Sequence, residues 1–131
     1  EHATRPTRLV DEIGRILKRG GVVYIATPDF NSLASKLLRR SWWAIVQAHN
    51  YFFTRDTLGR LVAQSGLGVL SLGTIGRSFS LNYWGHGLAR HSGPLSGLLQ
   101  AILKATRLDH RVVYLNLRDQ MELIAVKGGP P

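Results

Sequence analysis

The chain has 131 residues, of which 44% are hydrophobic and 19% are charged, a length and composition that suit one globular domain and exclude a disordered chain. Seventeen Lys and Arg against eight Asp and Glu give a formal net charge of +9, an excess that can attract nucleic acid, an anionic lipid or an acidic substrate. The absence of cysteine excludes a disulfide framework and a Cys-ligated zinc site, and no apolar run approaches the roughly 20 residues that a membrane span needs.

The first predicted element is a helix. Apolar residues recur at three- and four-residue spacing from Leu9 to Leu17, which places them on one face of a helix. Pro6 suits the first turn of this helix, because the N–H that it lacks would have no partner there. We expect Gly20 to end the helix in the left-handed conformation that is common at helix C-termini.

A buried strand and a short helix are expected next. Residues 22–26 are apolar, β-branched or aromatic on both faces, a pattern that is typical of a buried parallel strand. Residues 27–29 end this strand, and Asn31 or Ser32 is expected to cap a short helix that runs through Leu38.

A second helix and strand follow in the same order. Thr54 is a good N-cap for a helix that Gly66 ends, and residues 67–75 are predicted to form a strand. Helices that alternate with strands predict an α/β layer structure.

The last third of the chain has a different pattern. Residues 79–110 mix Ser, Gly and His with apolar stretches, and we expect one or two helices there, one of them over 95–103. Residues 112–117 are predicted to be extended, and 121–126 to form the final strand. Since no clear helix connects this strand to the preceding one, we expect it to run antiparallel.

Two glycine-containing segments invite comparison with a nucleotide-binding loop, which needs a strand, a glycine-rich turn and a helix in that order. Gly20-Gly21 follows a helix and precedes a strand, and residues 85–90 have Arg90 where the third glycine should be. We therefore expect no cofactor-binding loop in this chain.

Six segments together point to a family. They are Glu1-His2, the helix end 15–21 with its Arg-x-Leu-Lys-x-Gly-Gly pattern, the strand and Thr-Pro-Asp exit at 22–32, Trp42-Trp43 with 49–58, Gln64-Ser65-Gly66-Leu67, and 119–127. In this order they resemble the C-terminal half of a class I S-adenosylmethionine-dependent methyltransferase, of the group that includes ubiquinone-biosynthesis enzymes. The resemblance covers residues 1–76 well, 118–127 fairly well and 77–117 loosely.

The resemblance implies an α/β, Rossmann-like sheet with helices on both faces, of which this chain holds the last three strands, the final one antiparallel. Residues 1–131 would form a partial domain, with 1–76 and 118–127 as its core and 77–117 as a helical insertion or lid. The implied cofactor is S-adenosylmethionine, bound mainly by a preceding half. A start at Glu1 without an initiator Met agrees with such a fragment, which we expect to be inactive alone.

The resemblance also implies site residues, because ligands of open α/β sheets lie beyond the carboxyl ends of the strands. His2 and His49 are the candidate catalytic bases, since methylating a hydroxyl requires a group that takes its proton near neutral pH. No metal site is expected, because His86 and His91 have no carboxylate at ligand spacing. The candidate substrate-binding residues are Glu1, Thr27, Asp29, Asn31, Trp43 and Tyr51.

Each of these residues also has a structural interpretation. Glu1 and His2 can cap or orient the following helix, with catalysis or metal binding as the less favoured alternative. His49 can be a packed, hydrogen-bonded residue beside aromatic side chains. Trp43 and Tyr51 belong to a segment of aromatic residues that can simply form a core or lid cluster.

The resemblance implies a cytoplasmic enzyme that methylates a small molecule, a lipid or a glycan precursor. The alternative is a basic module that binds nucleic acid or an anionic membrane without catalysis. Nucleic acid is not the expected partner, because the aromatic residues lie in loops and not on a sheet face. Leu95, Leu98, Leu99 and Ile102 form an apolar stripe, flanked by Arg90, Lys104 and Arg107. The favoured interpretation is a helix packed over the sheet; the alternative is a lid that admits a lipid-like substrate or makes peripheral contact with an anionic membrane.

Overall fold

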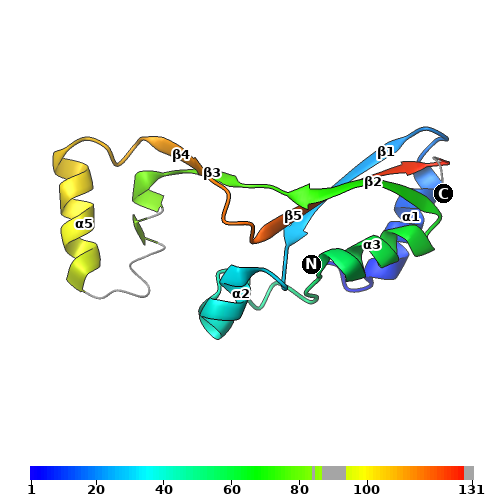
Figure 1. Cartoon of the computed structure of the whole chain (residues 1–131), viewed down its shortest axis with the longest axis horizontal. Coiled ribbons are helices and arrows are strands. Elements are labelled where there is room, and N and C mark those ends of the chain that lie inside the picture. Colours follow the sequence, from blue (N-terminus) through cyan, green and yellow to red (C-terminus); the bar gives the residue numbers. More distant parts are fainter. Residues whose placement is uncertain (84, 87–93, 129–131) are drawn as a thin grey trace. The chain divides into compact units, whose positions relative to one another are not determined.

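The computed structural model describes residues 1–83, 85–86 and 94–128 (Figure 1). The chain forms two compact units, one made of Glu1–Ile75 with Asn116–Pro131 and the other of Gly76–Leu115. The candidate site residues named above all lie in the first unit.

The first unit contains a three-stranded sheet whose central strand comes from the end of the chain. The strand order is β1-β5-β2, and β5 pairs antiparallel with both neighbours, so β1 and β2 run in the same direction. This confirms the predicted α/β class with an antiparallel last strand. The elements of this unit are α1 (Pro6–Ile16), β1 (Val22–Pro28), α2 (Leu33–Leu38), the 3-10 helix η1 (Arg39–Ser41), α3 (Arg55–Gln64), β2 (Leu67–Thr74) and β5 (Gln120–Lys127).

The core lies between the sheet and two helices. Strand β5 alternates regularly, and its inward side chains Met121, Leu123 and Ala125 are completely buried. They pack with buried residues of α1 and α3, among them Val10 and Val62. Helices α1 and α3 contact each other and lie on the same side of the sheet (Figure 1). Within the described residues, the expected helical cover is therefore found on one face of the sheet.

The prediction of a buried parallel strand over 22–26 is wrong in two respects. Within the described residues β1 pairs only with β5, and that pairing is antiparallel. Its side chains alternate in burial: Val23 and Ile25 pack against the core, whereas Val22 is 56% and Tyr24 51% exposed. The apolar run cannot indicate which face is covered, and α1 and α3 cover only the face that carries Val23 and Ile25.

Local signals placed the other helix ends well. Ser32 caps α2 by accepting from the Ser35 amide, and Thr54 caps α3 in a reciprocal capping box with Thr57, so both predicted N-caps are confirmed. Gly66 has the left-handed φ of 75° expected after α3. Gly20 is also left-handed (φ 77°), but α1 ends earlier, at Ile16, because the backbone of Leu17 is already extended. Gly20 therefore shapes the turn into β1.

The second unit contains a two-stranded antiparallel ribbon and a helix. Strand β3 (Arg77–Ser80) pairs with β4 (Val112–Leu115), and α5 spans Pro94–Ala105. The sequence predicted β4 and the helix but missed β3. The side chains of Leu95 and Leu99 from the expected apolar stripe, and residues Arg90 and His91, lie outside the described residues. Whether 77–117 is an insertion or a lid stays a prediction.

Among the described residues, no helix is both long enough and apolar enough to cross a membrane.

Candidate functional site

The candidate site is built where the first residues of the chain lie against a later loop. The backbone amides of Asn50 and Tyr51 both donate to the carbonyl oxygen of Glu1, at 2.8 and 3.3 Å. The Asn50 side-chain amide donates to the carbonyl of His2 at 2.9 Å. These bonds hold the main chain of Glu1 and His2 against the loop. The side chains of Glu1 and His2 are therefore available to form the site.

The carboxylate of Glu1 is held at the carboxyl end of β1. Thr27, the last but one residue of that strand, is 2% exposed, and its hydroxyl donates to Oε2 of Glu1 at 2.5 Å. The Glu1 side chain is itself only 19% exposed. The second carboxylate oxygen, Oε1, lies 4.0 Å from Nε2 of His2.

Both histidine rings of the site are oriented by backbone carbonyls. Nδ1 of His2 lies 3.0 Å from the oxygen of Ala48, and Nδ1 of His49 lies 2.7 Å from the oxygen of Ala44. Because a carbonyl oxygen can only accept, Nδ1 must carry the proton in each ring, and in the neutral imidazole Nε2 then presents a lone pair. The two rings meet edge to face, with centroids 4.7 Å apart.

The structure thus gathers Glu1, His2, His49 and Thr27 from the predicted set into one place. One candidate ligand atom from each of Glu1, His2 and His49 lies within 4.8 Å of the others. We call these three residues the Glu–His–His cluster. The interpretation of Glu1 or His2 as a helix cap is wrong, because the N-cap of α1 is Arg5 and it has no side-chain cap.

Asp29 and Asn31 form a turn beside this cluster. Asp29 is 4% exposed. Its Oδ1 accepts from the backbone amide of Asn31 at 2.9 Å, and its Oδ2 accepts from Nε of Arg55, at the start of α3, at 3.2 Å. Both carboxylate oxygens are thus engaged within the chain, which gives Asp29 a role in joining the exit of β1 to α3. The side chain of Asn31 is exposed, and substrate contact by either residue stays a prediction.

Trp43 is tied to a residue that the sequence did not single out. Its indole N–H and, at 3.4 Å, that of Trp42 both donate to Oδ2 of Asp119, a carboxylate that is 2% exposed just before β5. The Trp43 N–H is therefore engaged within the protein. Tyr51 is 41% exposed, and its hydroxyl donates to the carbonyl of Thr4 at 3.3 Å. For both residues, substrate contact stays a prediction.

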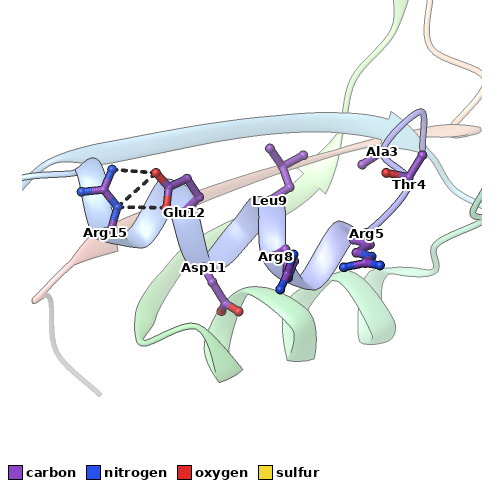
Figure 2. Close-up of a pocket in the computed structure, with 8 residues that line it drawn as sticks. All are labelled: Ala3, Thr4, Arg5, Arg8, Leu9, Asp11, Glu12 and Arg15. Atoms are coloured by element: carbon purple, nitrogen blue, oxygen red, sulfur yellow. Dashed lines mark hydrogen bonds and ion pairs between the residues drawn. The ribbon is translucent and has the colours of Figure 1, made fainter.

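Two hollows lie near the start of α1. The larger one has a volume of about 810 Å³ and is lined by residues of α1 and of the segment before it. Figure 2 shows these residues, among which Arg15 forms an ion pair with Glu12 (2.6 Å). The hydrogen bond and charge of Arg15 lower the pKa of Glu12. The other hollow, of about 100 Å³, reaches Glu1 and Thr27 and is otherwise lined by apolar side chains of α1, β1 and α3 with Phe53. Of these two hollows, the second is the one lined by a residue of the Glu–His–His cluster, Glu1.

Comparison with known proteins gives a family and a fold. The family model of a methyltransferase domain matches residues 1–72, and no curated protein matches. A solved structure from Bacillus halodurans C-125, assigned as a methyltransferase, matches 98% of this chain with 16% identity and a TM-score of 0.51. The chain spans 60% of the length of that protein. The [4+2]-cyclase SpnF matches 93% of this chain and 44% of its own, with 18% identity and a TM-score of 0.43. Since the matched segment is more than half of the sequence and contains the Glu–His–His cluster, the chain belongs to the methyltransferase-domain family.

Proposed function

We propose that this chain forms the acceptor side of an S-adenosylmethionine-dependent methyltransferase. The observation that carries the proposal is the Glu–His–His cluster at the carboxyl end of β1, within the segment that matches the family. Ligands of open α/β sheets bind at this edge, and two imidazoles with free Nε2 atoms are suited to proton transfer.

The residues of the chain fit the acceptor better than the cofactor. Among residues 1–83, 85–86 and 94–128, no glycine-rich turn joins the end of a strand to the start of a helix, which is the arrangement that holds a nucleotide in this kind of sheet. Gly20-Gly21 lies between α1 and β1, at the other end of β1 from Thr27. We therefore assign the cofactor to a segment outside this chain.

S-adenosylmethionine, when bound, supplies a methyl group on a positively charged sulfur. The residues of this chain act on the acceptor. Nε2 of His2 or His49 would take the proton of the acceptor hydroxyl as its oxygen receives the methyl group. The carbonyls of Ala48 and Ala44 hold the two rings in the tautomer that can accept it.

The hollow beside Glu1 supports a small-molecule or lipid-like acceptor. Its volume of about 100 Å³ and its apolar lining suit a short hydrocarbon group, which would leave an attached hydroxyl near Glu1 and the two imidazoles. Small-molecule sites generally combine such apolar walls with a few polar groups that fix orientation.

The proposal is tested by assaying the protein that carries this chain together with its cofactor-binding segment. We expect transfer of a labelled methyl group from S-adenosylmethionine to hydroxylated acceptors, with better kcat/KM for acceptors that bear an apolar group. Filling the hollow with Leu61→Trp should raise KM for those acceptors more than for small polar ones. An absence of methyl transfer to every acceptor, by a protein that binds the cofactor, would contradict the proposal.

A second candidate function, contact with an anionic membrane, rests on the unit Gly76–Leu115. On α5, Leu98 is 61% and Ile102 51% exposed, and their four-residue spacing puts them on one helix face. Lys104 and Arg107 lie two and five residues after Ile102 in the sequence. Exposed apolar residues with basic neighbours are typical of helices that lie in the membrane interface.

We expect this chain to co-sediment with vesicles that contain phosphatidylserine and to release them when Leu98 and Ile102 are both replaced by Asp. A matched variant is Leu33→Asp/Leu37→Asp on α2, where two leucines with the same spacing are 71% and 72% exposed. It should retain binding. If only the α2 variant loses binding, or if the wild-type chain does not bind, α5 is not a membrane contact.

A further inference from the structure

The Glu–His–His cluster has the composition of a metal site, although no metal site was expected from the sequence. His49 is 47 positions from His2 in the chain, and only the fold brings its ring to the other two residues. Two imidazoles and one carboxylate are the protein ligands of many catalytic zinc and iron centres, which keep further positions open for water or substrate.

Each candidate ligand is also held by a second group, as metal ligands usually are. The Nδ1 atoms of His2 and His49 donate to the carbonyls of Ala48 and Ala44, which leaves Nε2 of each ring as the atom that can bind a cation. The Thr27 hydroxyl holds one oxygen of Glu1 and leaves the other, Oε1, facing His2. The three supporting groups come from β1 and from the loop before residue 49.

The spacing is slightly wider than in a loaded site. The three ligand atoms lie within 4.8 Å of one another, whereas ligand atoms in a tetrahedral site with bonds of about 2.1 Å are about 3.4 Å apart. The widest separation must therefore shorten by about 1.4 Å for the cluster to bind a cation. The His2 side chain is 65% exposed, so its ring can make this movement without disturbing the core.

We propose that Glu1, His2 and His49 bind a divalent transition metal of the zinc class. Imidazole nitrogens favour Zn²⁺, Fe²⁺ or Co²⁺ over Mg²⁺ and Ca²⁺, which prefer oxygen ligands. With both Nε2 atoms on the cation, neither ring can take the acceptor proton. An open position on the cation would instead bind the acceptor oxygen and make its proton easier to lose to water. This consequence for catalysis rests on the proposed function, whereas the binding of the metal does not.

Binding is measured with Zn²⁺ by calorimetry and with Co²⁺ by visible absorption, on the chain alone, without cofactor or acceptor. We expect one metal per chain, a Co²⁺ spectrum of four or five coordination, and no competition from millimolar Mg²⁺. Glu1→Gln and His2→Ala should each weaken binding by at least tenfold, and Thr27→Val by about 10- to 100-fold. His110→Ala, which removes a histidine whose side chain is 92% exposed in the other unit, should leave binding unchanged.

The outcomes separate this inference from the proposed function. Absence of Zn²⁺ binding, or equal affinity in the wild type, Glu1→Gln and His2→Ala, would overturn the metal site and leave methyl transfer by imidazole bases intact. Metal binding without any methyl transfer would overturn the proposed function and would leave the inference of a metal site supported. Circular dichroism of each variant checks that the chain is still folded. We expect folding to be retained, because Glu1 and His2 are not part of the hydrophobic core.

Discussion

Replacing His49 with Gln is expected to lower kcat/KM for methyl transfer by about 10²- to 10⁴-fold, the range that a positioned acid–base group contributes. A Gln side chain can still donate an N–H to the carbonyl of Ala44, so the loop should keep its conformation. It has no basic nitrogen in place of Nε2, and it is a poor replacement for an imidazole ligand. The measurement is initial rate against acceptor concentration, with the cofactor saturating.

The matched control is His110→Gln, because His110 is exposed and its ring faces only Asp109 at 3.3 Å. We expect its kcat/KM to equal that of the wild type. If His49→Gln and His110→Gln have equal kcat/KM, His49 takes no part in proton transfer. That result would leave the role of His2 open to a separate test.

Replacing Leu123 with Ala should have the largest effect on stability. The side chain is completely buried at the middle of β5, among residues of both helices and of β1. Truncation of a buried leucine costs about 2–5 kcal/mol, since it removes apolar contacts and leaves a cavity. Urea denaturation followed by circular dichroism gives the free energy of unfolding. A transition that is no longer cooperative would indicate a still larger loss of stability.

Leu70→Ala on β2 is the comparison for this variant, because Leu70 has the same side chain in the same sheet but is 54% exposed. Its expected cost lies within about 0.5 kcal/mol of zero. Similar losses for the two variants would show that the face covered by α1 and α3 is not the core.

The features that the sequence predicted correctly are mostly local. Ser32 and Thr54 could be recognised as caps because a capping side chain bonds a backbone amide only two or three residues away. The antiparallel last strand followed from the lack of a crossover helix before it. Strand β1 was misjudged because its apolar pattern is the same on both faces, and only the packing of α1 and α3 decides which face is covered.

The sequence named the residues that the fold brings together in the Glu–His–His cluster, but it could not indicate that they meet. Glu1, His2 and His49 were each named, but no sequence pattern indicates that residues 47 positions apart share one cluster. Asp119 was missed because a lone acid in a turn resembles any solvated loop residue, although it accepts from two indoles. Two successive tryptophans, which each need an acceptor when buried, were the signal that could have prompted a search for such a carboxylate.

The central position of β5 has a consequence for how the chain folds during its synthesis. Strands β1 and β2 do not pair with each other; each pairs with β5, and the register joins Val22 to Val126, residues 104 positions apart. The nascent chain can therefore complete both helices of the first unit well before it can close any part of that sheet. Until residue 127 has left the exit tunnel, two unpaired strand edges stay open to other chains. The decisive step in the assembly of the first unit therefore waits for β5, and it is slow because it closes so long a loop.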